Sequence, residues 1–194
     1  MESGKRSWIY AGIAVAAGVG LVSSMSKSGL GSDERCRRLR CMKGGGIVLL
    51  SDAIGGGLAV PIAKLAAGSK MRLVAHHLRA GSTTRLLADP VREFVATRKP
   101  DLVLVAVGGD ELRAAGKLDA AALRRLATAI EDAGAPVVWI GPPMASQAAA
   151  GALLAPGREV FSSSALKIDR GPDGTTPTAA GYAGWAGAIW RWLS

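Results

Sequence analysis

Serine and histidine side chains stand where two short apolar runs end, a combination that could support nucleophilic chemistry. Ser51 follows the first run, His76 and His77 follow the second, and Ser82 lies a few residues further on. A serine hydroxyl becomes a nucleophile when an imidazole takes up its proton, so a Ser51–histidine or Ser82–histidine dyad is one hypothesis. The more ordinary interpretation is that one histidine packs and the other faces solvent.

Carboxylates form the second candidate group. Asp52, Asp110 and Glu111 come at the ends of predicted strands, and Asp173 precedes the last predicted helix. Oxygen ligands of this kind suit a hard cation. Because half of this cluster depends on predicted element ends, we predict no metal and no cofactor.

Strands alternate with helices from residue 46 onward, and this alternation would bring these residues together. Apolar runs predict strands at 47–50, 71–75, 102–107 and 137–140, and helical patterns occur at 58–67, 84–98, 119–133 and 178–193. Such alternation predicts a parallel sheet with helices on both faces, which is a three-layer α/β fold. Ligands of these folds bind at the carboxyl ends of the strands. The relevant loops are therefore 51–57, 76–84, 108–113, 141–146 and the segment before the last helix.

Aromatic residues gather in the last predicted helix. Tyr182, Trp185, Trp190 and Trp192 fall there, and their spacing fits one aromatic face packed in the core. If that face were exposed, the rings could instead stack on sugars or enter a membrane interface.

Four of the loops, taken in order, resemble the sequence blocks of SGNH (GDSL-like) hydrolases. The matching text is Leu50-Ser51-Asp52-Ala53-Ile54 for Gly-Asp-Ser, Gly81 in a small-residue turn, Gly108-Gly109-Asp110-Glu111 for Gly-x-Asn-Asp, and Asp173-Gly174-Thr175-Thr176-Pro177 for Asp-x-x-His-Pro. No single block is specific, but their ordered sum is. The resemblance covers residues 46–194 and implies an α/β/α fold, flavodoxin-like in outline, with the site of an ester hydrolase.

The departures from the family pattern fall on the residues that do the chemistry. The family's nucleophilic serine is Ala53 here, and its basic histidine is Thr176, so Asp173 has no imidazole to orient. A methyl group cannot attack a carbonyl, and a hydroxyl does not take up a proton near neutral pH as an imidazole does. Two backbone donors of the family's oxyanion hole would remain, at Ala53 and Gly81. Its asparagine is Asp110, whose carboxylate would repel a developing oxyanion.

No catalytic set is therefore intact, and we expect a catalytically degenerate relative of these hydrolases with a binding or structural role. The old cleft would take an acylated glycan or a cell-wall fragment through the positions Asp52, Gly81, Gly108, Asp110 and Asp173. Two alternatives stay open. One is an active esterase or acetyl-hydrolase with rearranged residues, and the other is a purely structural subunit with a vestigial cleft.

Composition bounds the remaining possibilities. The 194 residues are 49% apolar and 20% charged, which excludes wholesale disorder, and two cysteines exclude a disulfide scaffold. Residues 1–46 hold eight Lys/Arg and three acidic residues, so over half of the net charge of +9 lies there. The rest of the chain is only mildly basic. Nucleic acid is therefore not an expected partner, except through the basic segment.

The first 25 residues predict an apolar helix that attaches the chain to a membrane or an assembly. Residues 8–25 hold no charged side chain, and a helix of that length spans roughly 27 Å, close to a bilayer core. A membrane anchor, a signal peptide and a helix packed on a protein partner are the alternatives. Residues 26–45 are predicted as a basic flexible linker and 46–194 as the hydrolase-like domain. We expect a membrane-anchored or extracytoplasmic protein, or alternatively a component of a virus particle.

Overall fold

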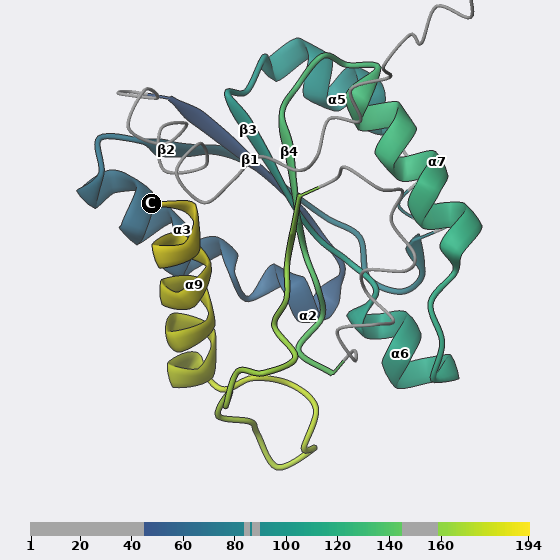
Figure 1. Ribbon diagram of the computed structural model, residues 1–194, viewed down its shortest axis with the longest axis vertical. Helices are drawn as coiled ribbons and strands as arrows, with labels where there is room; N and C mark the ends of the chain where they lie inside the picture. Colours follow the sequence, from purple (N-terminus) through teal and green to yellow (C-terminus); the bar gives the residue numbers. More distant parts are fainter. Residues whose placement is uncertain (1–44, 84–85, 87–89, 145–158) are drawn as a thin grey trace, which may run out of the picture.

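The computed structural model describes residues 45–83, 86, 90–144 and 159–194, which form a five-stranded sheet between two helical layers (Figure 1). All strand pairs are parallel, and the order across the sheet is β2-β1-β3-β4-β5. The strands are β1 (Gly46–Ser51), β2 (Arg72–Leu78), β3 (Leu102–Ala106), β4 (Val137–Ile140) and β5 (Glu159–Phe161). The helices are α2 (Ala53–Gly56), α3 (Ala59–Gly68), α5 (Val91–Arg98), α6 (Gly109–Ala115), α7 (Ala120–Glu131) and α9 (Ala179–Leu193). The predicted three-layer α/β fold is confirmed.

The two faces of the sheet carry separate cores. Along β1, Ile47 and Leu49 pack with the side chains of α3 and α9, whereas Val48 and Leu50 pack with those of α5 and α7. Successive side chains of a strand point to opposite faces, so a strand covered on both sides must be apolar throughout. With both faces covered, the carboxyl edge of the sheet is left to carry a site.

The last helix supplies the aromatic part of the first core. Trp185 is 1% exposed, and its indole N–H donates to the Ser163 hydroxyl at 2.8 Å. Trp192 packs against Phe161 with the ring centroids 5.5 Å apart. The interpretation of an aromatic core face is confirmed, and this face holds α9 against the sheet.

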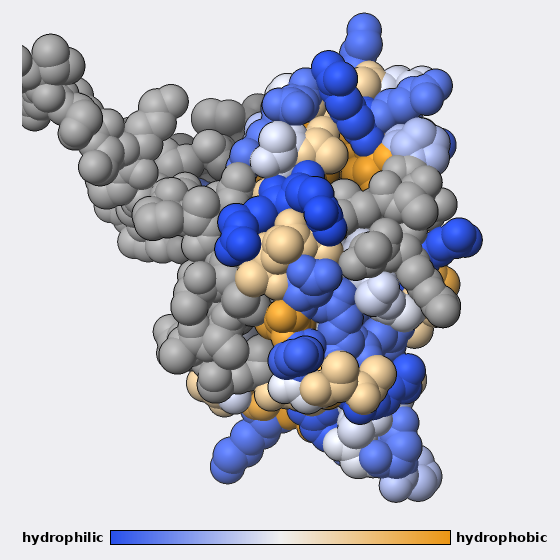
Figure 2. All heavy atoms as spheres, turned by 90° about the vertical axis from the view of Figure 1, so that its right-hand side faces the viewer, coloured by the Kyte–Doolittle hydropathy of each residue, from blue (hydrophilic) through white to orange (hydrophobic). Residues whose placement is uncertain are grey.

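The outer surfaces of α5 and α7 are polar. Figure 2 shows this side of the molecule, with hydrophilic side chains over most of the coloured surface and small apolar areas between them. The exposed residues include Arg92 and Arg98 of α5, and Arg124 and Arg125 of α7. Both helices are amphipathic, so their sequences position them by burying one face each.

Short elements are where the structure departs from the sequence-based prediction. The helices α2 and α6 begin inside the expected loops 51–57 and 108–113, and β5 lies in a region with no predicted element. Elements of three to seven residues give too little periodicity to recognise. Within the helix predicted at 84–98, Leu86 is helical and α5 spans Val91–Arg98, and Pro90 directly before α5 has a non-helical ψ of 61°.

The predicted apolar helix at 1–25 and nearly all of the predicted linker at 26–45 lie outside the described residues. Within the described ranges, none of the helices is both long enough and apolar enough to cross a bilayer.

Candidate functional site

Asp52 connects the ends of two neighbouring strands. It is 3% exposed and caps α2, where its Oδ1 accepts the Gly55 N–H at 2.8 Å. Its Oδ2 accepts the Asp110 N–H at 3.0 Å, which ties the end of β1 to the start of α6. Burial raises the pKa of this carboxyl, and the charge of Asp110 adds to the increase. Asp52 therefore holds two segments of the site in place, as a buried and fully engaged acceptor.

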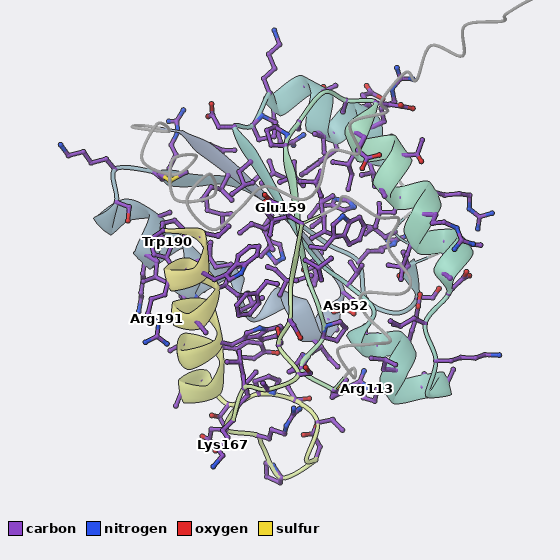
Figure 3. The ribbon with its side chains drawn as sticks, viewed as in Figure 1. Asp52, Arg113, Glu159, Lys167, Trp190 and Arg191 are labelled. Carbon is purple, nitrogen blue, oxygen red and sulfur yellow. The ribbon has the colours of Figure 1, made fainter. Side chains whose placement is uncertain are left out.

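Asp110 brings three segments together at one carboxylate. Its Oδ2 accepts the backbone N–H groups of Ala53 at 3.1 Å and Gly81 at 2.7 Å. Its Oδ1 lies 3.2 Å from the guanidinium of Arg113, one turn further along α6. The carboxylate is 5% exposed. Asp52 and Arg113 lie at the same edge of the sheet (Figure 3).

This arrangement corrects the expectation for the oxyanion hole. The sequence predicts two N–H donors free to hold an oxyanion and a carboxylate that repels it. Instead, the donors of Ala53 and Gly81 both bind Asp110. An ionised carboxylate is an acceptor only, so Asp110 engages both N–H groups as their acceptor.

Glu111 holds the neighbouring loop in a similar way. It is 7% exposed, and its two oxygens accept the backbone N–H groups of Thr83 and Asp119, the latter at 3.0 Å. The acids proposed as a cation cluster thus turn to backbone donors. Across residues 45–83, 90–144 and 159–194, no three His, Cys, Asp or Glu side chains are arranged to hold a metal.

Ser51 and His76 are brought together by the pairing of β1 with β2. The Ser51 Oγ lies 2.8 Å from the His76 Nε2. Burial lowers the pKa of His76, and neighbouring His77 contributes to the decrease. Nevertheless, Ser51 is 0% exposed, so its hydroxyl cannot reach a substrate from this position. His77 packs on Phe94, with ring centroids 4.9 Å apart, and Ser82 lies half-buried after Gly81.

The loop before α9 closes on itself through Asp173. Its Oδ2 accepts the Thr176 hydroxyl at 2.6 Å, and its Oδ1 accepts the N–H groups of Thr175 at 3.0 Å and Thr176 at 2.9 Å. The pKa of Asp173 lies well below its usual range, and the hydrogen bond from the Thr176 hydroxyl is the largest cause. Asp173 is exposed. The Thr176 hydroxyl therefore donates its proton within its own loop.

Tyr182 and Arg113 belong to the site but were not among the predicted site residues. The Tyr182 hydroxyl donates to the carbonyl oxygen of Ile54 at 2.8 Å, which links α9 to α2. Burial raises its pKa, with further contributions from the charges of the site acids Asp52, Asp110 and Asp173. The spacing of Arg113 three residues after Asp110 on a helix was the only sequence signal for that pair.

Comparison with solved structures identifies the fold. No protein-family model and no curated protein matches the chain. A Clostridium thermocellum family 3 carbohydrate esterase superposes with a TM-score of 0.61 at 17% identity, covering 76% of this chain and 94% of that chain. The Enterococcus faecalis lipase/acylhydrolase gives 0.58 at 19% identity over 76% and 94%. TesA gives 0.56 at 19% over 77% and 98%.

These neighbours are SGNH/GDSL-type esterases. The chain therefore has an SGNH-like three-layer α/β fold. Identities this low show the fold alone, since one fold carries many functions.

Proposed function

We propose that this chain is a catalytically degenerate SGNH-like protein with a binding or structural role. The observation that carries the proposal is the Asp110 carboxylate, whose Oδ2 accepts the N–H groups of both Ala53 and Gly81. Esterases of this kind need such donors for the oxyanion that forms when an ester carbonyl is attacked. Here a negative charge already fills that place, and a second one would be repelled.

The other catalytic roles support the same proposal. Ala53 offers a methyl group at the nucleophile position, and Thr176 offers a hydroxyl that is bonded to Asp173 at 2.6 Å. Members of such catalytic sets act as a unit, and losing one costs on the order of 10⁴-fold in turnover. With the nucleophile, base and oxyanion donor all replaced, no ester hydrolysis is expected.

The proposed binding role uses the same edge of the sheet. Asp52, Gly81, Gly108, Asp110 and Asp173 would line a site for an acylated glycan or a cell-wall fragment, and one neighbour's name as a carbohydrate esterase supports this class of ligand. The apolar residues 8–25 and the basic linker would place the domain at a cell envelope, by a membrane anchor or signal-like segment, or within an assembly such as a virion. Nucleic acid would be contacted only through the linker.

An ester assay on the full chain tests the proposal. With p-nitrophenyl acetate, the wild type should show no turnover above buffer. The triple variant Ala53→Ser/Asp110→Asn/Thr176→His should gain measurable turnover, because it restores nucleophile, donor and base at their family positions. Its matched control is Ala53→Ser alone, which keeps Asp110 in the hole and should stay inactive. Wild-type turnover that exceeds hydrolysis of the ester in buffer alone would refute the proposal.

An active esterase with rearranged residues is the second candidate, because Ser51 and His76 are within hydrogen-bond distance; the buried Ser51 hydroxyl would have to become accessible for this pair to act. If wild-type turnover is found, Ser51→Ala and His76→Ala should abolish it while Ser82→Ala leaves it unchanged. If neither wild type nor triple variant acts on esters, calorimetry with an acetylated xylan oligosaccharide separates the other roles. Binding supports a ligand-binding domain, and no heat supports a structural subunit with a vestigial cleft.

A further inference from the structure

The Asp110 carboxylate is bound as a free carboxylate ligand would be bound. One oxygen receives two backbone N–H donors, at 3.1 Å from Ala53 and 2.7 Å from Gly81, and the other oxygen lies 3.2 Å from the Arg113 guanidinium. The two N–H donors come from separate segments, one after β1 and one after β2. Three donors converging on one nearly buried carboxylate, which is 5% exposed, make an anion-binding arrangement.

The two backbone donors are held in place by contacts that do not involve the Asp110 side chain. The Gly81 loop is fixed by the bond from the Thr83 N–H to Glu111, and Gly81 itself has a φ of 99°, which favours glycine. The Ala53 side is fixed by the Asp52 cap and by Gly55, where an added Cβ would lie 2.1 Å from the Ala106 carbonyl oxygen. Removing the carboxylate should therefore leave the donors where they are.

We propose that the N–H groups of Ala53 and Gly81 form a preformed anion hole that Asp110 keeps closed, and that a small carboxylate competes with Asp110 for it. The proposal rests on the proposed function, because it takes Ala53 as a position without a nucleophile. Attachment to the same chain gives the Asp110 carboxylate an effective concentration of at least about the millimolar range. Free carboxylates at lower concentrations would not displace it, so the wild-type hole stays closed to them.

Arg113 adds a third, weaker contact for a competing anion once the hole is open. Its side chain is 47% exposed, so it can follow a ligand that enters from solvent. A surface guanidinium alone contributes little to anion binding. We therefore expect the NMR signals of the Ala53 and Gly81 N–H groups, and not only those of Arg113, to change when an anion binds.

Acetate is the probe, with NMR titration of the Ala53 and Gly81 amide signals in the full chain as the readout. In Asp110→Ala both amides should shift and saturate, with acetate bound about tenfold or more tighter than by the wild type. Asp110→Asn should bind acetate with an affinity between those of the wild type and Asp110→Ala, because its neutral amide oxygen still fills the hole. Asp132→Ala, which removes an exposed aspartate at the end of α7, is the matched charge control and should behave as the wild type.

Two outcomes would overturn the proposal. One is an Asp110→Ala variant that binds acetate no tighter than the wild type, and the other is binding that shifts neither amide and disappears in Asp110→Ala/Arg113→Ala. If Asp110→Ala does not fold, hydrogen exchange in the wild type still decides. The Ala53 and Gly81 amide protons should be protected by the carboxylate, and exchange as fast as in an open loop would contradict a closed hole.

The anion hole and the proposed function fail in different experiments. Acetate binding needs no nucleophile, so it is measured without reference to turnover. Wild-type esterase activity would refute the degenerate role, whereas an Asp110→Ala variant indifferent to acetate would refute the anion hole.

Discussion

The acids of this site fall into two regions, one buried and one exposed, and the two regions differ in where the hydrogen-bond donors to these acids come from. Asp52 is buried directly after β1 and Asp110 in the first turn of α6, and they bind backbone groups 58, 57 and 29 residues away in sequence. Asp173 is exposed and binds only residues two and three positions further along its own loop. Burial raises the pKa of Asp52, whereas local hydrogen bonds lower that of Asp173.

The difference shows which part of the site depends on tertiary structure. The buried region connects three segments, so a change in one acid alters the positions of the others. The exposed loop forms its own turn, and one substitution there changes a side chain without moving the sheet. We therefore expect substitutions at position 176 to be tolerated more easily than substitutions of the carboxylates in the buried region.

The largest effect should come from removing the buried acid Asp52. Asp52→Ala loses the cap of α2 and leaves the Asp110 N–H without its acceptor, which should lower the free energy of unfolding by about 2–3 kcal/mol. Asp119→Ala is the control, because Asp119 also caps a helix, with its side chain on the Ala122 N–H at 2.9 Å. It should cost only about 1 kcal/mol in urea unfolding. Equal costs would show that Asp52 is a cap and nothing more.

Tyr182 is the contact between α9, which follows the exposed loop, and α2 in the buried region. Tyr182→Phe keeps the ring but removes the 2.8 Å hydrogen bond to Ile54. Because the Ile54 carbonyl then lacks this donor, the free energy of unfolding should fall by about 1 kcal/mol. Urea unfolding measures this. An unchanged midpoint would mean that the hydroxyl bond contributes nothing and that the two regions are independent.

Much of the fold and of the site's location was predictable, because it depends on local patterns. The strand at Val137–Ile140 was predicted to the residue, and the long apolar run predicted β3. Parallel strands place their carboxyl ends along one edge. This is why Asp52, Gly81 and Asp110, from three predicted loops, were expected together and do lie within hydrogen-bond distance of one another's segments.

The state of the site was not predictable, because it depends on side-chain direction. The sequence led us to expect Asp110 where the resembled family has an asparagine, but it does not indicate that the carboxylate turns onto the two N–H donors. Likewise, Ser51 and His76 were a candidate dyad, and only the structure shows that Ser51 is 0% exposed while its partner His76 is half-buried. Both outcomes depend on long-range packing, which leaves no local signal.

The exposed loop should respond to a single hydroxyl. In Thr176→Ala the pKa of Asp173 should rise toward its ordinary value of 3.8, because its largest cause of decrease is gone. Thr175→Ala is the control and should give a smaller rise, since the side chain of Thr175 is the last of the causes. Carboxyl NMR titration measures both.

The sign for stability follows from the same shift. Because the pKa of Asp173 is lower in the folded state, this carboxylate stabilises the protein at pH values above the unfolded-state pKa of 3.8. This stabilisation is lost as the pH falls through the folded-state pKa. Thr176→Ala should therefore weaken the acid dependence of unfolding. An equal response of the two threonine variants would assign the effect to the backbone N–H groups instead.

The smallest effect should be the response of Asp52 to the charge of its neighbour. In Asp110→Asn the pKa of Asp52 should decrease, because the charge of Asp110 is one cause of its increase, but it should stay above 3.8, because burial is the largest cause. Because the pKa of Asp52 is raised in the folded state, the free energy of unfolding decreases as the pH rises from the unfolded-state pKa to the folded-state pKa. The pH range of this decrease should be narrower in the variant. Carboxyl NMR titration of Asp52 measures the change. A return to 3.8 would make the charge of Asp110, and not burial, the main cause of the raised pKa of Asp52.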